Sequence, residues 1–434
     1  MPPVPAFTPP SVPDVAPRLL LLYDTPMEQN RLNQPNQKHS GTAALLCMLA
    51  LMAFAYVLLH DLLGGTLLAH SAWDSYTLQA MAWRRGSLSL GQNYPWLELA
   101  VYEGEYFVSF PPFPSVVMLP FTFIFGENTP NNLIVAAVTM ASAALAFRCL
   151  RRTGMQDAHC ALGALFLTFG SNMMWMSTDG GVWFMAQAIN MLLLLWALDA
   201  AMLGRRILAY ALIALAVGCR PFSALMFFPL FLYCYLEDRE EGVGFLKTAF
   251  KQWKAFLIPM AVAAAYMWYN AARFDSVLEF GHNYLPEFTE SEHGQFHLSY
   301  ILTNLKNLLL RPVALEKDLS LSYTFFDGFM FYVANPFFLV LFGAVIGDIR
   351  HKRMDALRLA LLLSMAANLL LLCWHKTLGG WQFGARYTCD MLPAALAYFL
   401  LGKRTAFRRW ECMAAAFGIL FNVYGALAMT FLYG

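Results

Sequence analysis

The sequence predicts an all-α polytopic membrane protein, because its apolar residues form long runs and its basic residues concentrate at alternate ends of those runs. Hydrophobic residues make up 59% of the 434 residues and charged residues only 13%, about half the charged share of an ordinary soluble domain. A helix needs about 20 apolar residues to cross a hydrocarbon layer of about 30 Å. Several runs approach that length.

Eleven apolar runs are interpreted as transmembrane helices. They cover residues 42–63, 131–147, 158–176, 182–203, 207–219, 221–236, 255–270, 326–347, 357–374, 387–401 and 412–432. Segment 113–125 is also apolar but is short and contains prolines, so we expect a helix at the interface or a shallow dip. A second interfacial helix is expected near residues 73–85, where Leu78, Met81 and Ala82 recur at helical spacing.

The distribution of Lys and Arg predicts the orientation in the membrane. With the N-terminus in the cytoplasm, the inner segments hold 20 of the 29 basic residues, as the positive-inside rule requires. A full crossing by segment 113–125 would place Arg148, Arg151 and Arg152 outside and break this pattern. The prediction is a multi-pass protein of the cell membrane.

Two regions follow from this topology. Residues 1–40 are Pro-rich and polar and are expected to form a disordered cytoplasmic tail. Residues 41–434 form an integral membrane domain with outer loops at 64–130, 271–325 and 375–386. Because long loops in compact proteins usually carry function, the active site is expected on the outer, non-cytoplasmic face.

The first outer loop contains two candidate catalytic carboxylates. Asp74 begins the predicted interfacial helix, where a partly desolvated carboxylate could act as a general base on an acceptor hydroxyl. Asp is also a favoured helix N-cap, so a purely structural role is the alternative. Glu105, with Glu103 close by in YEGEYFVSFPPFP, is a second candidate acid or else a solvated loop residue.

Basic and aromatic residues of the candidate site lie later in the chain. Arg220 interrupts two apolar runs, where a guanidinium is costly unless it pairs or reaches water; it suits a phosphate, or it snorkels to headgroups. The segment HKTLGGWQFGARYTCDMLP supplies Lys376 and Arg386 as cations. Its Trp381 and Tyr387 could stack on sugars or belong to an interfacial aromatic belt.

The chain lacks several well-known cofactor motifs. No HExxH, P-loop, GxGxxG or Asp-x-Asp motif is present, and His293 and His297 at a spacing of four are a weak metal signal. We therefore expect no metal and no other cofactor. No basic stripe suggests nucleic acid as a partner.

In their order along the chain, these motifs resemble the GT-C-type membrane glycosyltransferases that use polyprenyl-phosphate sugars. That superfamily includes protein mannosyltransferases and bacterial aminoarabinose transferases. The motifs are an acid just after the first helix, GEYFVSFPP, an Arg-Pro pair, Asn270 with Arg273, and GGWQFGARY. The resemblance covers most of residues 42–400. This chain departs from the usual pattern at Ser75, Phe113 and Asp275.

The resemblance implies inverting transfer of a hexosyl or pentosyl group from a polyprenyl-phosphate donor to an acceptor hydroxyl, with no nucleotide and no obligatory metal. Asp74 takes the place of the catalytic acid. The family often has two adjacent acids there, whereas Ser75 follows Asp74, so the second acid is Glu105 or its neighbour Glu103, with Glu105 as our choice. The residues assigned to the donor phosphate are Arg386, Arg220 and Lys376. Those assigned to other substrate contacts are Trp381, Tyr387, Tyr106, Asn270 and Arg273.

Expected partners are the lipid-linked donor, an acceptor that the sequence does not identify, and membrane lipids. The alternative function is a transporter or flippase of lipid-linked sugars, which would share the helices and the arginines at the membrane boundary. Transporters often contain inverted repeats and charges at the midplane. The sequence shows no convincing internal repeat, which favours the transferase.

Overall fold

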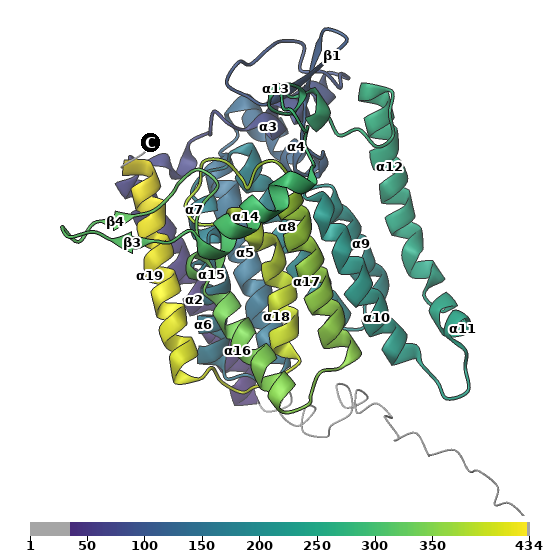
Figure 1. The fold of residues 1–434 in the computed structure, drawn as a ribbon, viewed down its shortest axis with the longest axis vertical. Coiled ribbons are helices and arrows are strands. Elements are labelled where there is room, and N and C mark those ends of the chain that lie inside the picture. Colours follow the sequence, from purple (N-terminus) through teal and green to yellow (C-terminus); the bar gives the residue numbers. More distant parts are fainter. Residues whose placement is uncertain (1–34, 432–434) are drawn as a thin grey trace, which may run out of the picture.

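The computed structural model describes residues 35–431, which form a bundle of roughly aligned helices with loops and short elements gathered at one end (Figure 1). The bundle helices are α2 (Pro35–Leu62), α5 (Asn131–Arg152), α6 (Asp157–Thr168), α7 (Met173–Met176), α8 (Val182–Met202), α9 (Arg206–Val217), α10 (Phe227–Asp238), α12 (Leu257–Phe274), α15 (Phe331–Ala334), α16 (Phe337–Arg350), α17 (Ala356–Trp374), α18 (Leu392–Leu400) and α19 (Arg409–Phe431). Short 3₁₀ helices η4 (Pro221–Met226), η5 (Trp253–Phe256) and η7 (Arg386–Met391) precede α10, α12 and α18.

Each of the eleven predicted apolar ranges coincides with a helix or with consecutive helical segments. Within residues 35–431, six helices are long and apolar enough to cross a membrane. The other ranges are shorter or interrupted, as between α15 and α16, where Pro336 separates the segments. The all-α polytopic membrane fold is therefore confirmed, whereas the number eleven stays a prediction. Helix α2 begins at Pro35, before the predicted start, and residues 1–34 of the predicted tail lie outside the described residues.

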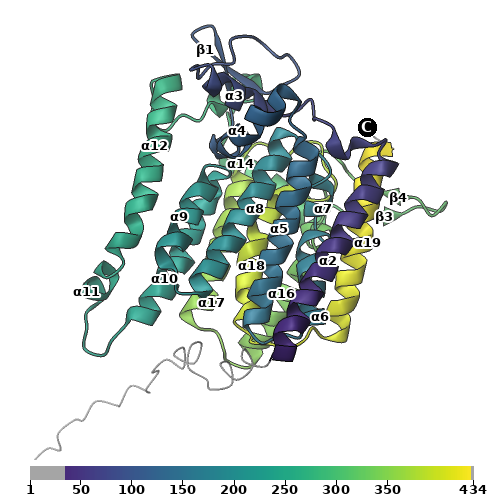
Figure 2. The ribbon, with the colours of Figure 1, turned by 180° about the vertical axis from the view of Figure 1, so that it is seen from behind.

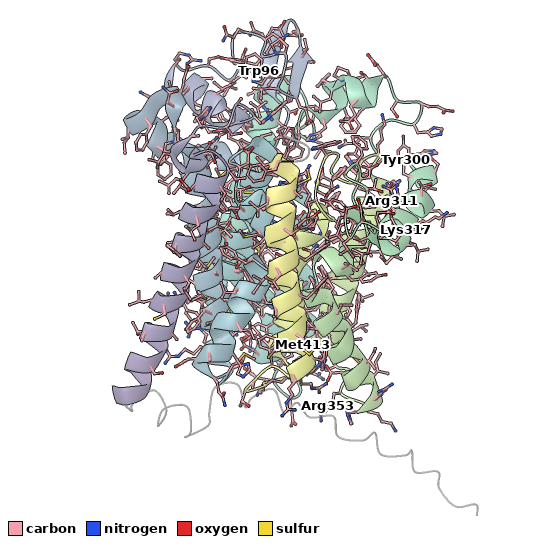
Figure 3. All side chains as sticks on the ribbon, turned by 90° about the vertical axis from the view of Figure 1, so that its left-hand side faces the viewer. Trp96, Tyr300, Arg311, Lys317, Arg353 and Met413 are labelled. Carbon is pink, nitrogen blue, oxygen red and sulfur yellow. The ribbon has the colours of Figure 1, made fainter. Side chains whose placement is uncertain are left out.

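The long predicted loops lie at one end of the bundle, and the predicted cytoplasmic hairpins lie at the other. Figure 3 shows Trp96, from the first long loop, at one end and Arg353 at the opposite end. The short elements at the loop-bearing end are η2 (Thr66–Leu68), α3 (Ser75–Arg84), β1 (Leu99–Tyr102), β2 (Glu105–Val108), α4 (Phe113–Phe125), η3 (Gly126–Asn128), η6 (His282–Tyr284) and α13 (Pro286–Thr289). Helix α14 (Leu298–Leu310) crosses the upper part of the bundle, and the hairpin of β3 (Ala314–Leu315) and β4 (Leu321–Ser322) projects sideways beside α19 (Figure 1). Helix α11 (Phe245–Phe250) lies near the other end. The side of the membrane that each end faces stays a prediction.

Both expected short helices are present in the first loop, and they pack together. Arg84 of α3 donates to the Thr122 carbonyl of α4, and its guanidinium lies 4.3 Å from the Phe123 ring centre. Gln79 accepts from Ser115 of α4 (2.6 Å) and donates to Tyr269 of α12 (2.7 Å). Helix α3 is therefore fixed from two sides.

The β1–β2 hairpin was not predicted. Its strands pair antiparallel around Glu103 and Gly104, whose φ angles are 51° and 82°. Two consecutive positive φ angles are typical of a type I′ hairpin turn. The strands are only four residues long, too short for alternation to stand out in the sequence.

Helix α12 stands apart from most of the bundle (Figure 2). Its Arg273 donates to the Val108 carbonyl of β2 (2.7 Å) and to the Asn270 side chain (3.2 Å). Asn270 in turn donates to the Val277 carbonyl. These bonds tie the end of α12 to the hairpin.

A buried amide network joins the interrupted helices. Asn172, just before α7, exchanges hydrogen bonds with Asn335 (2.8 and 3.0 Å) and donates to Asn422 of α19 (3.0 Å). The Ala385 amide also donates to Asn172 (2.9 Å). Amide groups in an apolar interior must be paired, so this network anchors the segment before η7 to three parts of the bundle.

Asn335→Leu is expected to lower the melting temperature of the purified protein. The change removes the acceptor of the Asn172 main-chain amide and one of the two donors to the Asn172 side-chain oxygen, and an unsatisfied buried group costs about 1–3 kcal/mol. Leu420→Ala on the exposed face of α19 is the control. An equal melting temperature for Asn335→Leu and wild type would contradict the anchoring role.

Candidate functional site

A cavity of about 1280 Å³ opens at the loop-bearing end of the bundle. One wall comes from the first long loop and the start of α8, and another from the junction of α9 with η4. Residues 278–288, the segment before η7 and the ends of several bundle helices also contribute to the lining. This volume exceeds that of a typical small-ligand pocket, so the cavity can hold a sugar together with a phosphate.

Two arginines and a tyrosine form the basic part of the cavity wall. The guanidinium carbons of Arg220 and Arg386 lie 4.4 and 4.7 Å from the ring centre of Tyr387. All three residues line the cavity. Cation–π contacts of this kind stabilise a guanidinium most when it is withdrawn from water, so the two charges are held close together in a partly dry site.

Arg220 is held by a buried carboxylate. Its Nε donates to Asp390 at 2.8 Å, and only 3% of the Asp390 side chain is exposed. Burial opposes the charge of Arg220, but Asp390 and Tyr387 hold its pKa above the usual value. Asp390 also accepts from Gln187 and Asn190 of α8 at 3.3 and 3.5 Å.

Arg386 is held by a main-chain carbonyl and by Gln187. Its Nε and Nη2 donate to the Gly379 carbonyl at 3.1 and 2.7 Å, and Nη1 donates to the Gln187 side chain at 3.2 Å. Gly379 has a φ of 115°, which a residue with a side chain rarely adopts. Burial lowers the pKa of Arg386, and no carboxylate within hydrogen-bonding distance neutralises it in the described residues.

Carboxylates occupy other parts of the cavity wall. Glu98, close before β1, accepts from the Trp183 indole at 3.1 Å. Its side chain is exposed at the cavity mouth, but loss of hydration against the wall raises its pKa, an effect that the Trp183 bond and the charge of Arg386 oppose. Glu287 of α13 is exposed, and its partial loss of hydration raises its pKa, which the charge of Lys376 opposes. The cavity therefore has both cationic groups and proton acceptors.

Asp74 is the N-cap of α3. Its Oδ1 accepts from the Tyr76 amide (2.9 Å) and the Thr77 amide (3.1 Å), and its Oδ2 accepts from the Thr77 hydroxyl. The side chain is buried, and burial raises its pKa. Asp74 does not line the cavity, but its neighbours Trp73 and Tyr76 do.

Two histidines line the cavity as neutral groups. Burial lowers the pKa of His282 to about 3, with further lowering by His375 and Arg220. Burial lowers the pKa of His375 to about 4. At neutral pH both imidazoles are uncharged, so they supply hydrogen bonds rather than positive charge.

The structure brings four of the predicted site residues to the cavity wall: Arg220, Trp381, Arg386 and Tyr387. Asp74 adjoins the wall as described. The five other predicted residues do not line the cavity: Glu105, Tyr106, Asn270, Arg273 and Lys376. Lys376 donates to the Glu287 carbonyl (2.6 Å) beside the cavity. Glu105 accepts from Ser89 in an exposed position.

The other three residues away from the wall belong to the hairpin region. The main-chain carbonyl of Tyr106 accepts from Leu90, and its side chain packs against the core. Asn270 and Arg273 fix the end of α12 to the hairpin, as described above. Their predicted substrate contacts stay predictions.

Sequence reasoning missed Glu98, Gln187 and Asp390. A signal was available for two of them. Gln187 is polar in a long apolar helix, and Asp390 lies next to an apolar run; both are costly in a membrane without partners. Glu98 lies in a polar loop and gives no such signal.

Within residues 35–431, no group of three or more His, Cys, Asp or Glu side chains is placed to hold a metal ion. His293 and His297 stack with ring centres 4.0 Å apart, and His297 caps α14. The expected independence from metal stays a prediction.

Two solved structures of one membrane protein superpose on most of this chain. ArnT from Cupriavidus metallidurans superposes in its apo state with a TM-score of 0.52 and in its undecaprenyl-phosphate-bound state with a TM-score of 0.53, both at 14% sequence identity. The matches cover 86% and 85% of this chain and 62% of ArnT. The chain has a GT-C-like fold. The resemblance in the sequence is thus confirmed at the level of the fold.

Other comparisons add less. The oligosaccharyltransferase of Archaeoglobus fulgidus matches with a TM-score of 0.45 at 14% identity, over 89% of this chain and 56% of that chain. No family model and no curated protein sequence matches this chain. The chain spans less than two thirds of the length of ArnT.

Stability is expected to fall as the pH drops from 7 toward 4, partly through His282. The unfolded histidine takes up a proton near its ordinary pKa of about 6.5, whereas the folded one resists protonation until about pH 3. The unfolded state therefore binds more protons in this window and is favoured as the pH falls. His282→Gln should flatten the fall of melting temperature between pH 7 and pH 4; an unchanged slope would contradict the depressed pKa.

Proposed function

We propose that this multi-pass membrane protein is a glycosyltransferase that moves a sugar from a polyprenyl-phosphate donor to an acceptor hydroxyl on the non-cytoplasmic face. The observation that carries the proposal is the pair Arg220 and Arg386, which both contact the ring of Tyr387 in a cavity that also contains carboxylates. The shared fold with ArnT, which has been solved with undecaprenyl phosphate bound, supports it. The lipid-linked sugar is the co-substrate, and the proposal needs no metal or other cofactor.

In this proposal the two guanidinium groups bind the donor phosphate. When the bond between the anomeric carbon and the phosphate oxygen breaks, negative charge builds on that oxygen. Cations already fixed in a site with little water stabilise that charge without reorganising. Asp390 and Gln187 provide the fixation by holding the two arginines in place.

Asp74 is proposed as the general base. Its Oδ1 accepts from two main-chain amides and its Oδ2 accepts from the Thr77 hydroxyl, and the Asn131 side chain also interacts with the carboxylate. That hydroxyl can rotate away and let an acceptor O–H take its place. The proton passes to Oδ2 as the acceptor oxygen attacks the anomeric carbon opposite the phosphate, which inverts its configuration and releases polyprenyl phosphate. Burial raises the pKa of Asp74, in the direction that suits a base near neutral pH.

The remaining predicted residues receive roles that fit their positions. Trp381 and Tyr387 line the cavity and offer aromatic faces to the sugar. We propose that Lys376 acts through its bond to Glu287, by holding α13 beside the cavity. Glu105, Tyr106, Asn270 and Arg273 would act indirectly, through the hairpin that adjoins α3. A transporter of lipid-linked sugars remains the alternative.

The purified protein is expected to form glycosylated product from a synthetic polyprenyl-phosphate sugar and a panel of hydroxyl acceptors. Asp74→Asn should reduce kcat by about 10²–10⁴-fold, the usual contribution of a general base. Its fold should survive, because Asn caps a helix about as well as Asp. Product is measured by mass spectrometry, and the melting temperature is measured alongside.

Glu98→Gln is the matched control, because Glu98 lines the cavity but is not the proposed base. An active Asp74→Asn with an inactive Glu98→Gln would move the base to Glu98. Bound donor without product for any acceptor, combined with movement of the donor across vesicles, would instead support the transporter.

Arg386→Ala is expected to weaken binding of undecaprenyl phosphate. A ligand that binds only the folded protein raises its melting temperature by an amount that grows with the logarithm of its affinity, so the shift should shrink for this variant. Lys376→Ala, which removes a cation outside the cavity wall, should keep most of the shift. Equal shifts for Arg386→Ala and wild type would remove Arg386 from the phosphate site.

A further inference from the structure

Tyr76 is a buried tyrosine with an unused hydroxyl. It lies in the first turn of α3 and is fully buried. Among the described residues, its hydroxyl has no hydrogen-bond partner. A buried hydroxyl without a partner costs free energy, so such a group in a folded protein calls for an explanation.

The position of Tyr76 suggests one. The residue lines the large cavity together with Cys219 and Arg220. Burial raises the pKa of Tyr76, and the charge of Arg220 opposes this while that of Asp74 adds to it. The phenol is therefore protonated at neutral pH. It lies close enough to Arg220 and Asp74 for both to influence its pKa.

The backbone holds this phenol firmly. The Tyr76 amide donates to Asp74 at 2.9 Å, so the cap fixes the turn that carries the side chain. Gln79, one turn further along α3, is tied to Ser115 and Tyr269. The phenol is thus placed before any ligand binds, which lowers the entropy cost of using it.

We propose that the Tyr76 hydroxyl is a hydrogen-bond donor to the phosphate group of the lipid-linked substrate, beside Arg220. This inference rests on the proposed function and adds to it a residue that no motif indicated. A phosphate oxygen is an acceptor and attracts Arg220, so it satisfies the phenol and the guanidinium at once. A neutral alcohol would satisfy the phenol but gain little from the arginine. Asp74 then has a second effect, because its cap positions Tyr76.

The test compares Tyr76→Phe with Tyr56→Phe. Tyr56 is also buried, but its hydroxyl donates to Ser177 at 2.7 Å, and it does not line the cavity. Each variant is purified in full length, and its melting temperature is measured alone. Affinity is then measured for undecaprenyl phosphate, for undecaprenol without the phosphate, and for inorganic phosphate.

Without ligand, Tyr76→Phe should melt at or above the wild-type temperature, since it removes only an unpartnered hydroxyl, whereas Tyr56→Phe should melt lower. Tyr76→Phe should bind undecaprenyl phosphate about tenfold to a hundredfold more weakly, the range for a hydrogen bond to a charged group. Its affinity for undecaprenol should equal that of wild type. Tyr56→Phe should bind the phosphorylated lipid normally. If Tyr76→Phe also binds inorganic phosphate more weakly than wild type does, that result supports the inference too, and it shows that the phenol recognises phosphate without help from the lipid chain.

Two results would overturn the inference while the proposed function stands. One is equal affinity of wild type and Tyr76→Phe for undecaprenyl phosphate. The other is a melting temperature of Tyr76→Phe as low as that of Tyr56→Phe, which would show that the hydroxyl already has a partner. If wild type itself fails to bind undecaprenyl phosphate, the inference and the proposed function fall together.

Discussion

The placement of two guanidinium groups at 4.4 and 4.7 Å from the centre of one aromatic ring, that of Tyr387, is the constraint on which the site depends. Charges withdrawn from water destabilise a protein unless hydrogen bonds and opposite charges surround them. Arg220 meets this requirement through Asp390, and Arg386 through Gly379 and Gln187. These partners come from α8 and from the segment around η7. The site can therefore form only when separate parts of the bundle have packed in register.

Polar networks inside the bundle also help to fix the positions of the segments that carry the arginines. Asn172, Asn335 and Asn422 connect broken helices to the chain just before Arg386. In an apolar environment such amides find few alternative partners, so they select one arrangement of the helices. At the breaks between α6 and α7 and between α15 and α16, main-chain and side-chain groups are thus free to form hydrogen bonds to neighbouring segments. They connect the membrane bundle to the cavity above it.

The cavity combines a rigid wall with a wall made of loops. Hydrogen bonds fix helix α3 to α4 and α12. Gln187 of α8 and Asp390 of η7 hold Arg386 and Arg220 in place. Residues 278–288, by contrast, close the cavity with short turns and the four-residue helix α13. Functional loops on a rigid scaffold are a common arrangement, because the scaffold fixes the reactive groups while the loops admit the substrate. The neutral histidines in this region leave positive charge confined to the arginines.

The sequence alone determined the class of protein, the apolar ranges, the short helices before and after the hairpin, and four residues of the cavity wall. Its length scales and charges carry that information, because a bilayer demands long apolar helices and penalises an isolated arginine. Only the tertiary structure decided which polar groups meet. Gln187 lies 199 residues from Arg386, and Arg220 lies 170 residues from Asp390, so neither contact follows from local spacing. Glu98 and Tyr76, whose hydroxyl has no hydrogen-bond partner among the described residues, became visible as parts of a site only when helix packing brought distant segments around one cavity.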